Sequence, residues 1–417
     1  MKPKIFFPLA LLSASLLLSS CLISTDKPDI DRVEPRPLTQ EEQEVVQNSK
    51  SFGLDLFKQI NSNSDASNLF ISPLSVSMAL DMTLNGAQND TKSGMKEALR
   101  QSDLSLDAIN KSNQSLIKLL THLDPKVNIK LANSIWYKNN FTVEQDFIDV
   151  NQSYYDAEVQ GLDFSSADAA NQINNWVSDK TESLIDEIIK GRIPSDIVMY
   201  LINAIYFKAN WWSKFDEDDT RKAPFTTDTG SRVDVDMMSQ QQTFPLYVGS
   251  DASMIDLPYG DSLFTMSVIL PPTDTKIDTF VNHLTSEKLD TWFQQLSAHK
   301  TNLYLPRFKI KYQHLLNDVL ARMGMGKAFE PYAADFSGIN QDQQLFISKV
   351  LHKSYIKVDE AGTEAAAVTA VGVALTGVDP NQPYTFRVDR PFVYLIRERT
   401  TNTILFMGKM GNPNPTS

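Results

Sequence analysis

The sequence predicts an α+β protein, and three observations carry that prediction. Helical periodicity dominates the first part of the 417-residue chain, and segments rich in β-branched and aromatic residues follow later. The two kinds of segment do not alternate, which argues against βαβ units and favours large, mainly antiparallel sheets. Hydrophobic residues make up 42% of the chain and charged residues 22%, a composition typical of a globular protein.

The chain starts with a targeting segment. Two lysines precede an apolar run from Ile5 to Leu18, which is too short for a transmembrane helix of about 20 apolar residues. The stretch LSSC then ends at Cys21 and resembles a bacterial lipobox. We predict a lipoprotein signal peptide over residues 1–20 and lipidation of Cys21, which would attach the protein to a lipid membrane. An ordinary signal peptide with an incidental cysteine is the alternative.

A polar tether is predicted next, over residues 21–45, followed by a domain over residues 46–417. The tether is rich in Pro, Asp, Glu and Ser. Thr39 is a candidate N-cap, so the first helix is expected to begin near it and to run toward Asn61. The predicted location is a bacterial cell envelope, with the lipid in the outer membrane or at the cell surface.

The domain contains recognisable helical and strand-like segments. Helical periodicity is found at 52–60, 75–87 and 169–189, and the last helix is expected to stop before Gly191. A hairpin turn is expected at Thr400 to Asn402. Strand-like composition is found at 198–209, 265–271, 301–310, 354–360, 392–398 and 403–410.

Several kinds of chemistry are disfavoured by composition and spacing. The chain has one cysteine and five scattered histidines, so neither a disulfide within the chain nor a recognisable metal site is expected. No nucleophile elbow or phosphate-binding glycine motif is present, and acid pairs such as Asp216/Asp218 and Glu287/Asp290 are interpreted as surface charge. A net charge of −12 argues against nucleic-acid binding. We therefore expect no enzyme activity and no cofactor.

Motifs distributed along the domain together resemble the serpin family of serine protease inhibitors. They occur in the family's order and cover nearly all of residues 46–417: NLFISPLSVSMAL (68–80), LANSIWYK (131–138), INNWVSDKT (173–181), LINAIYFKANWWSKFDEDDT (201–220), LPRFKI (305–310), ADFSGI (334–339), LFISKVLHKSYIKVDEAGTEAAAVT (345–369) and RPFVYLIRERTTNTILFMGKMGNP (390–413).

The resemblance implies a serpin fold with three β-sheets, about eight or nine helices and an exposed reactive-centre loop near the C-terminus. It also implies inhibition of serine endopeptidases by a suicide-substrate mechanism. The protease cleaves the loop and stays attached as a covalent acyl complex, while the loop inserts into the main sheet as an added strand. Serine proteases are the expected partners, cysteine proteases are a second class, and the protein is expected to be a monomer.

The segment from Val358 to Gly377 has the composition that insertion requires. It contains no proline, and no charge occurs from Ala365 to its end. A strand starting at Thr363 would carry only small or β-branched side chains on one face, because side chains alternate between faces. A charge on that face would cost several kcal/mol. Its absence favours an insertion-competent loop over an Ala-rich linker or an amphipathic helix, and an inhibitory over a non-inhibitory protein. The residues that match the family's hinge are Glu360, Gly362, Thr363, Glu364, Ala365, Ala366, Ala367 and Thr369.

The reactive bond is expected at Thr376–Gly377, counting the family's loop length from Gly362. Leu375 is the alternative residue before the cut. The stretch from Val373 to Val378 lacks Arg and Lys, so a trypsin-like protease is poorly matched. A small apolar pocket of the elastase kind fits Thr, Ala or Val, whereas Leu375 would suit a chymotrypsin-like or subtilisin-like protease.

Four further positions match family residues that control the sheet. Ser75, Asn203 and His352 match the shutter, the polar cluster beneath the opening strands, and Trp211 matches the breach, where the loop first enters. Their implied roles are structural, and His352 is expected to form hydrogen bonds rather than to abstract a proton. Two other functions are weighed against inhibition: a non-inhibitory serpin that acts as an envelope binding protein, and a hydrolase with dispersed catalytic residues.

Overall fold

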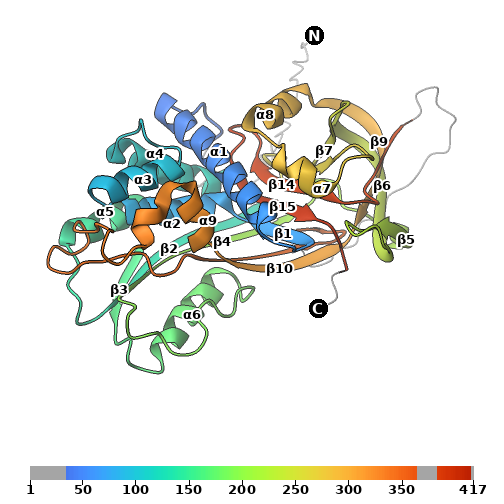
Figure 1. The fold of residues 1–417 in the computed structure, drawn as a ribbon. Helices are drawn as coiled ribbons and strands as arrows, with labels where there is room; N and C mark the ends of the chain where they lie inside the picture. The colour runs from blue at the N-terminus through green and yellow to red at the C-terminus, as the bar shows by residue number, and fades with distance from the viewer. Residues whose placement is uncertain (1–33, 364–382, 415–417) are drawn as a thin grey trace, which may run out of the picture.

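The computed structural model describes residues 34–363 and 383–414, so the predicted signal peptide and Cys21 lie outside the described residues. Within that part the chain forms nine α-helices and fifteen strands, which confirms the α+β class (Figure 1). The helices are α1 (Gln40–Ser62), α2 (Pro73–Leu84), α3 (Asn89–Ala98), α4 (Leu106–His122), α5 (Gln145–Tyr155), α6 (Ala169–Lys180), α7 (Ile277–Asn282), α8 (Ser286–Gln295) and α9 (Asn317–Leu320). The strands are β1 (Asn68–Ile71), β2 (Val127–Lys138), β3 (Glu158–Leu162), β4 (Met199–Asn210), β5 (Arg221–Thr226), β6 (Arg232–Val248), β7 (Ser253–Tyr259), β8 (Phe264–Leu270), β9 (Ser297–Pro306), β10 (Phe308–Leu315), β11 (Leu351–Val358), β12 (Gly362–Thr363), β13 (Tyr384–Arg387), β14 (Phe392–Glu398) and β15 (Ile404–Met410).

Helix α1 begins where the sequence predicted. The Thr39 hydroxyl accepts a hydrogen bond from the backbone N–H of Glu42, and the Glu42 carboxylate accepts one from the Thr39 N–H. This capping box satisfies two N–H groups that a helix start leaves without partners. Residues 40–45, which were assigned to the tether, therefore form the first turns of α1, and Val45 is buried.

A six-stranded sheet has the order β10-β11-β12-β4-β2-β3. Strands β2 and β4 pair antiparallel from Val127↔Ala209 to Tyr137↔Met199. Figure 1 shows the helices α1 to α5 on one side of this sheet and α6 on the other. Alternation along β2 separates two apolar clusters, since Ile135 belongs to the core on the α1 side and Trp136 packs with Trp176 of α6.

The remaining strands form one nine-stranded sheet in the order β1-β15-β14-β8-β7-β6-β9-β13, with β5 paired to β6. The described residues thus form two sheets, whereas three were expected. The cause is β6, whose 17 residues pair with β5, β7 and β9 along different parts of its length. One long, shared strand joins what would otherwise be two hydrogen-bonded units.

The prediction of a single helix over 169–189 was wrong in its end point. Helix α6 ends at Lys180, and Glu182 and Ser183 adopt positive φ of 51° and 63°, which a continuing helix does not allow. The Thr181 hydroxyl bonds back to the Val177 carbonyl and closes the last turn. Residues 181–198 then cross the sheet as an irregular segment, called the strap below. The predicted hairpin is confirmed: β14 and β15 pair antiparallel, and Asn402 in the turn has a φ of 58°.

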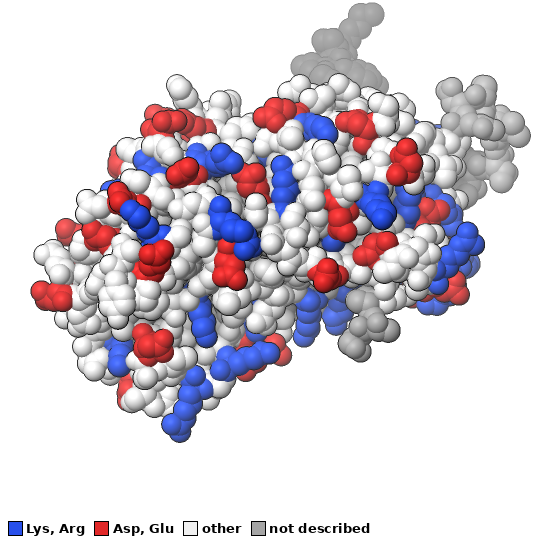
Figure 2. Space-filling model, viewed as in Figure 1, with Lys and Arg blue, Asp and Glu red and all other residues white. Residues whose placement is uncertain are grey.

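The predicted strand over 301–310 is two strands. Arg307 separates β9, which belongs to the nine-stranded sheet, from β10, which belongs to the six-stranded sheet. Arg307 therefore lies at the junction of the two sheets. None of the described helices is both long and apolar enough to cross a membrane. Figure 2 shows basic and acidic side chains interspersed over the face of the molecule that it presents.

Candidate functional site

The candidate site is the boundary between β4 and β11 in the six-stranded sheet, called the seam below. Strand β12 lies in the seam at one end and pairs antiparallel with both neighbours. Its pairs are Gly362↔Asn210 and Thr363↔Ala209 on one side and Val358↔Thr363 on the other. In the described chain no other ladder joins β4 to β11. The sheet is therefore bridged across the seam by a strand of two residues.

Gly362 fits in this position because it has no Cβ. Its φ is +155°, in the region that side chains disfavour. A Cβ added there would lie 2.1 Å from the Ala209 carbonyl oxygen and 2.7 Å from the Asn210 Cα, both of which are backbone atoms of β4. The close approach of β12 to β4 thus requires glycine.

Thr363 is held by an aromatic pair at the same end of the seam. Its side chain is 3% exposed, and its hydroxyl is hydrogen-bonded to the Tyr259 hydroxyl at 2.5 Å. Burial raises the pKa of Tyr259 far above its usual value, so the phenol stays neutral and can donate. The Tyr259 ring stacks on Trp211 with ring centroids 4.5 Å apart.

Trp211, the predicted breach residue, binds the chain that leads into β12. Its indole Nε1–H donates to the Asp359 carbonyl at 2.9 Å, and its backbone N–H donates to the Ala361 carbonyl at 3.0 Å. The backbone N–H of Phe215 donates to the Glu360 carbonyl at 3.0 Å. Three successive carbonyls of the hinge region are therefore fixed by residues that follow β4.

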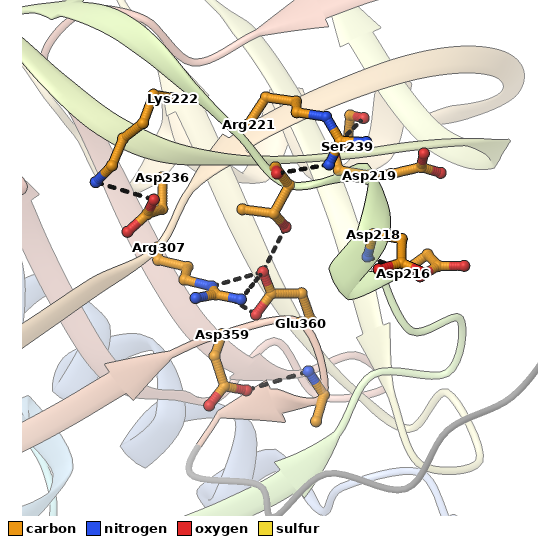
Figure 3. Close-up of polar contacts among 12 residues, drawn as sticks. Asp216, Asp218, Asp219, Arg221, Lys222, Asp236, Ser239, Arg307, Asp359 and Glu360 are labelled. Carbon is orange, nitrogen blue, oxygen red and sulfur yellow. Dashed lines mark hydrogen bonds and ion pairs between the residues drawn. The ribbon is translucent and has the colours of Figure 1, made fainter.

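Glu360 is anchored by its side chain as well. It is 4% exposed, and the Arg307 Nε–H donates to its two oxygens at 2.5 and 2.6 Å (Figure 3). The Thr220 hydroxyl donates to the same carboxylate, and the hydrogen bond from Arg307 to Glu360 raises the pKa of the guanidinium. The neighbouring Asp359 carboxylate accepts from the N–H groups of Ala361 and Gly362, so the backbone is pinned just before β12.

The three predicted shutter residues meet at the first turn of α2. The Ser72 N–H donates to His352 Nε2 at 3.2 Å, and the Ser75 hydroxyl donates to the Asn203 carbonyl at 3.4 Å. The start of α2 thus contacts β11 and β4, the two strands that border the seam. His352 does not bond directly to Ser75 or Asn203 in the described residues, so α2 connects them.

His352 is in its neutral form in this environment. The residue is 5% exposed, and its Nε2 accepts a hydrogen bond, which a protonated ring nitrogen cannot do. Burial lowers the pKa of His352 to about 4, and His314, its cross-strand partner on β10, adds to the effect. A neutral, accepting imidazole is suited to a structural role.

The strap crosses the face of the sheet opposite to α2 and contacts a strand on each side of the seam. The Lys130 ammonium on β2 pairs with Glu182, and the Lys353 ammonium on β11 donates to the Glu187 carbonyl. A strand added to the seam beyond Thr363 would lie between α2 and the strap.

Several predicted residues fall outside the described residues. They are Glu364, Ala365, Ala366, Ala367, Thr369, Leu375, Thr376 and Gly377. Conversely, the predictions missed Arg307, Thr220 and Tyr259, which hold the hinge. Thr220 and Arg307 lie within quoted motifs and Tyr259 lies outside them, but each has its partner 53 to 140 residues away, so no local pattern reveals the contact. No cluster of metal-ligating side chains occurs in the part of the chain that the structure describes.

Comparison with known proteins agrees with this architecture. The family model described as "Serpin (serine protease inhibitor)" matches residues 47–413. The leukocyte elastase inhibitor of Equus caballus is 35% identical over 373 residues, which cover 87% of this chain and 97% of that protein.

Two solved structures have the same fold. The native state of the thermophilic serpin tengpin superposes with a TM-score of 0.81 at 33% identity, covering 91% of this chain and 97% of tengpin. Human thyroxine-binding globulin superposes with a TM-score of 0.82 at 28% identity, covering 90% of this chain and all 100% of that chain. With a family model that spans the whole domain and relatives matched over nearly their full length, this chain belongs to the serpin family.

Proposed function

We propose that this serpin inhibits serine endopeptidases as a suicide substrate and is not itself an enzyme. The observation that carries the proposal is β12. Two hinge residues, Gly362 and Thr363, lie in strand geometry between β11 and β4. The seam beyond them has no ladder among the described residues, so backbone groups on both sides are available to an added strand.

The register of β12 defines how far an added strand can extend. Thr363 pairs with Ala209, so each further loop residue would pair one position earlier in β4. Continued without a bulge, this register brings Val373 opposite Met199, the first residue of β4. On the other side Ala370 would reach Leu351, the first residue of β11. The uncharged segment after Glu364 therefore matches the length of the seam.

We propose an elastase-like target. The relative from Equus caballus is named for inhibition of leukocyte elastase, and the proposed reactive bond Thr376–Gly377 offers a small residue to the protease. Cleavage after Leu375 instead would favour chymotrypsin-like or subtilisin-like proteases. Sequencing the new N-terminus of the released C-terminal peptide distinguishes the two bonds.

The direct test mixes the purified protein with leukocyte elastase and with pancreatic elastase and separates the products on denaturing gels. A protease–serpin band that survives SDS is expected. Replacement of Thr363 by Arg should abolish that band and leave only cleaved protein, because burial of a guanidinium at a 3% exposed site costs several kcal/mol. Thr363→Ser keeps the hydroxyl that bonds Tyr259 and is the matched control.

The same gels test the other two functions. Loop cleavage with no stable band, across elastase, chymotrypsin and subtilisin, would refute inhibition and favour a non-inhibitory binding protein. Peptide hydrolysis by the protein alone would favour a hydrolase. An unchanged stable band with Thr363→Arg would refute the role given to the hinge.

We further propose that the mature protein is lipid-anchored to a bacterial envelope through Cys21. The support is the sequence LSSC after the short apolar run. Labelling of the expressing bacteria with radioactive palmitate should mark the protein, and Cys21→Ala should lose both the label and membrane fractionation. A labelled Cys21→Ala variant would contradict the anchor.

A further inference from the structure

A cavity of about 520 Å³ lies at the end of the seam farthest from β12. Its walls come from α2, the strap, the first residues of β4 and the segment 343–353. Cavities of about 300–1,000 Å³ are typical of small-molecule sites.

Most of the wall is apolar. Ala79 and Leu80 of α2 contribute to it, as do Ile185 and Ile188 of the strap, and Leu201 comes from β4. Each methylene transferred from water to such a wall contributes favourably to binding. An alkyl chain is therefore the chemical group that fits the interior.

Cations outnumber acids among the lining residues. Lys190, Arg192, Lys349 and Lys353 line the cavity together with one carboxylate, that of Asp196. The first three are exposed and form no ion pair within the described residues. This local excess of positive charge occurs in a chain whose net charge is −12. In Figure 2, basic side chains are frequent along the lower edge of the molecule, where Figure 1 places α6.

One residue that lines the cavity has a polar atom without a hydrogen-bond partner among the described residues. Asn203 lines the wall and donates to Asn133 through Nδ2, but its buried Oδ1 has no hydrogen-bond partner in the described part of the chain. Buried carbonyl oxygens in this state are usually satisfied by a water or a ligand donor.

We propose that this cavity binds a single-chain amphipathic anion, with its alkyl chain between α2 and the strap and its charged head at Lys190, Arg192 and Lys349. The second part of the inference rests on the proposed inhibitory function. In the register of β12, an added strand would pass Leu201 and Met199, which also line the cavity. The ligand and the inserting loop would therefore compete for the same space, and the anion would convert the inhibitor into a substrate.

The first experiment measures binding without any protease. Dodecanoate should displace 11-(dansylamino)undecanoate from the full-length protein, whereas dodecyltrimethylammonium, which has the same chain and the opposite charge, should displace it poorly. The double variant Arg192→Glu/Lys349→Glu should weaken dodecanoate binding by about tenfold or more. Lys118→Glu/Lys276→Glu, at two exposed positions that do not line the cavity, is the matched charge control.

A second variant tests the interior. Ala79→Trp places an indole in the cavity and should abolish probe binding, and its thermal unfolding is measured to establish that it folds. The site is refuted if the parent protein does not bind dodecanoate saturably, if the charge-reversed variant binds like the parent, or if both alkyl ions bind equally. If Ala79→Trp does not fold, the double variant Arg192→Glu/Lys349→Glu alone tests whether the cavity is the binding site.

The competition is tested separately. Saturating dodecanoate should reduce the SDS-stable elastase complex and increase cleaved serpin, and the charge-reversed variant should resist this effect. Binding without any change in complex formation refutes the competition and leaves the site intact. Failure of the parent protein to inhibit any protease refutes the proposed function, while the binding result stands on its own.

Discussion

Replacement of Gly362 by Ala tests whether β12 is the entry point for the loop. The added Cβ would lie 2.1 Å from the Ala209 carbonyl oxygen, whereas ordinary contacts lie at 3.4–4 Å, so the backbone of β12 must move away from β4. That movement breaks the pairs Gly362↔Asn210 and Thr363↔Ala209 and displaces Thr363 from Tyr259.

The size of the effect follows from these losses. A side chain in a region of backbone conformation favoured by glycine costs about 1–3 kcal/mol, and loss of the Thr363–Tyr259 hydrogen bond costs about 1 kcal/mol. The sum, about 2–4 kcal/mol, corresponds to about 30-fold to 1,000-fold in a rate if all of it opposes insertion. In the proposed mechanism insertion competes with deacylation, so most of the Gly362→Ala protein should be cleaved without trapping protease.

The assay is titration of active elastase with the variant, together with denaturing gels. The amount of serpin consumed per protease inhibited should rise by more than about tenfold, and the thermal unfolding of the uncleaved variant should move to lower temperature because the same contacts are lost there. Gly230→Ala is the matched control, since Gly230 also has a positive φ, +83°, but an added Cβ there meets nothing within 4 Å. A Gly362→Ala protein that inhibits like the parent, or a Gly230→Ala protein with the same defect, would refute the assignment of β12.

Three further predictions concern charged and titratable groups. A double-mutant cycle with Glu360→Gln and Arg307→Met, measured by urea unfolding, should give a coupling free energy of about 1–2 kcal/mol, because the carboxylate is buried and the guanidinium is partly exposed. Additive effects of the two substitutions would exclude the ion pair as an anchor of the hinge. Burial raises the pKa of Asp81 from 3.8 to about 7, so this carboxyl lowers the free energy of unfolding as the pH rises from about 4 to about 7. The Asp81→Asn variant should therefore be more stable than the parent above pH 7, by up to about 4 kcal/mol, and should lose that advantage near pH 4. Urea unfolding measured as a function of pH tests this. His352 has the opposite pH dependence, since its pKa is lowered from 6.5 to about 4. Its contribution to the free energy of unfolding, up to about 3 kcal/mol, is lost as the pH falls through that interval. If the unfolding free energy of His352→Gln varies with pH in parallel with that of the parent, this prediction is wrong.

Local features of the fold were predictable because their causes lie within a few residues. The start of α1 needs only Thr39 and Glu42, three positions apart, and the turn between β14 and β15 needs only a short loop with Asn402 in positive φ. Motif resemblance predicted Trp211 as the breach residue and Ser75, Asn203 and His352 as the shutter, and the structure places the latter three around the first turn of α2.

Contacts between distant segments were not predictable in the same way. Nothing in the polar stretch of β6 indicates one strand of 17 residues that joins three neighbours. The pairing of Glu360 with Arg307 depends on the junction between two sheets, which becomes visible only in three dimensions. The apolar residues after Lys180 continue a helical spacing, but they pack across the sheet as the strap because the backbone reverses at Glu182 and Ser183.

The open seam also sets a pattern of solvent exchange. One side of β4 is hydrogen-bonded to β2 along nearly all of its length, whereas its other side is paired, among the described residues, only at Ala209 and Asn210. Amide protons on alternate residues of β4 should therefore exchange with deuterium at two very different rates. In backbone terms β4 is an interior strand on one side and an edge strand on the other. Covalent complex formation with a protease would convert the fast-exchanging half of its amides into the slow class.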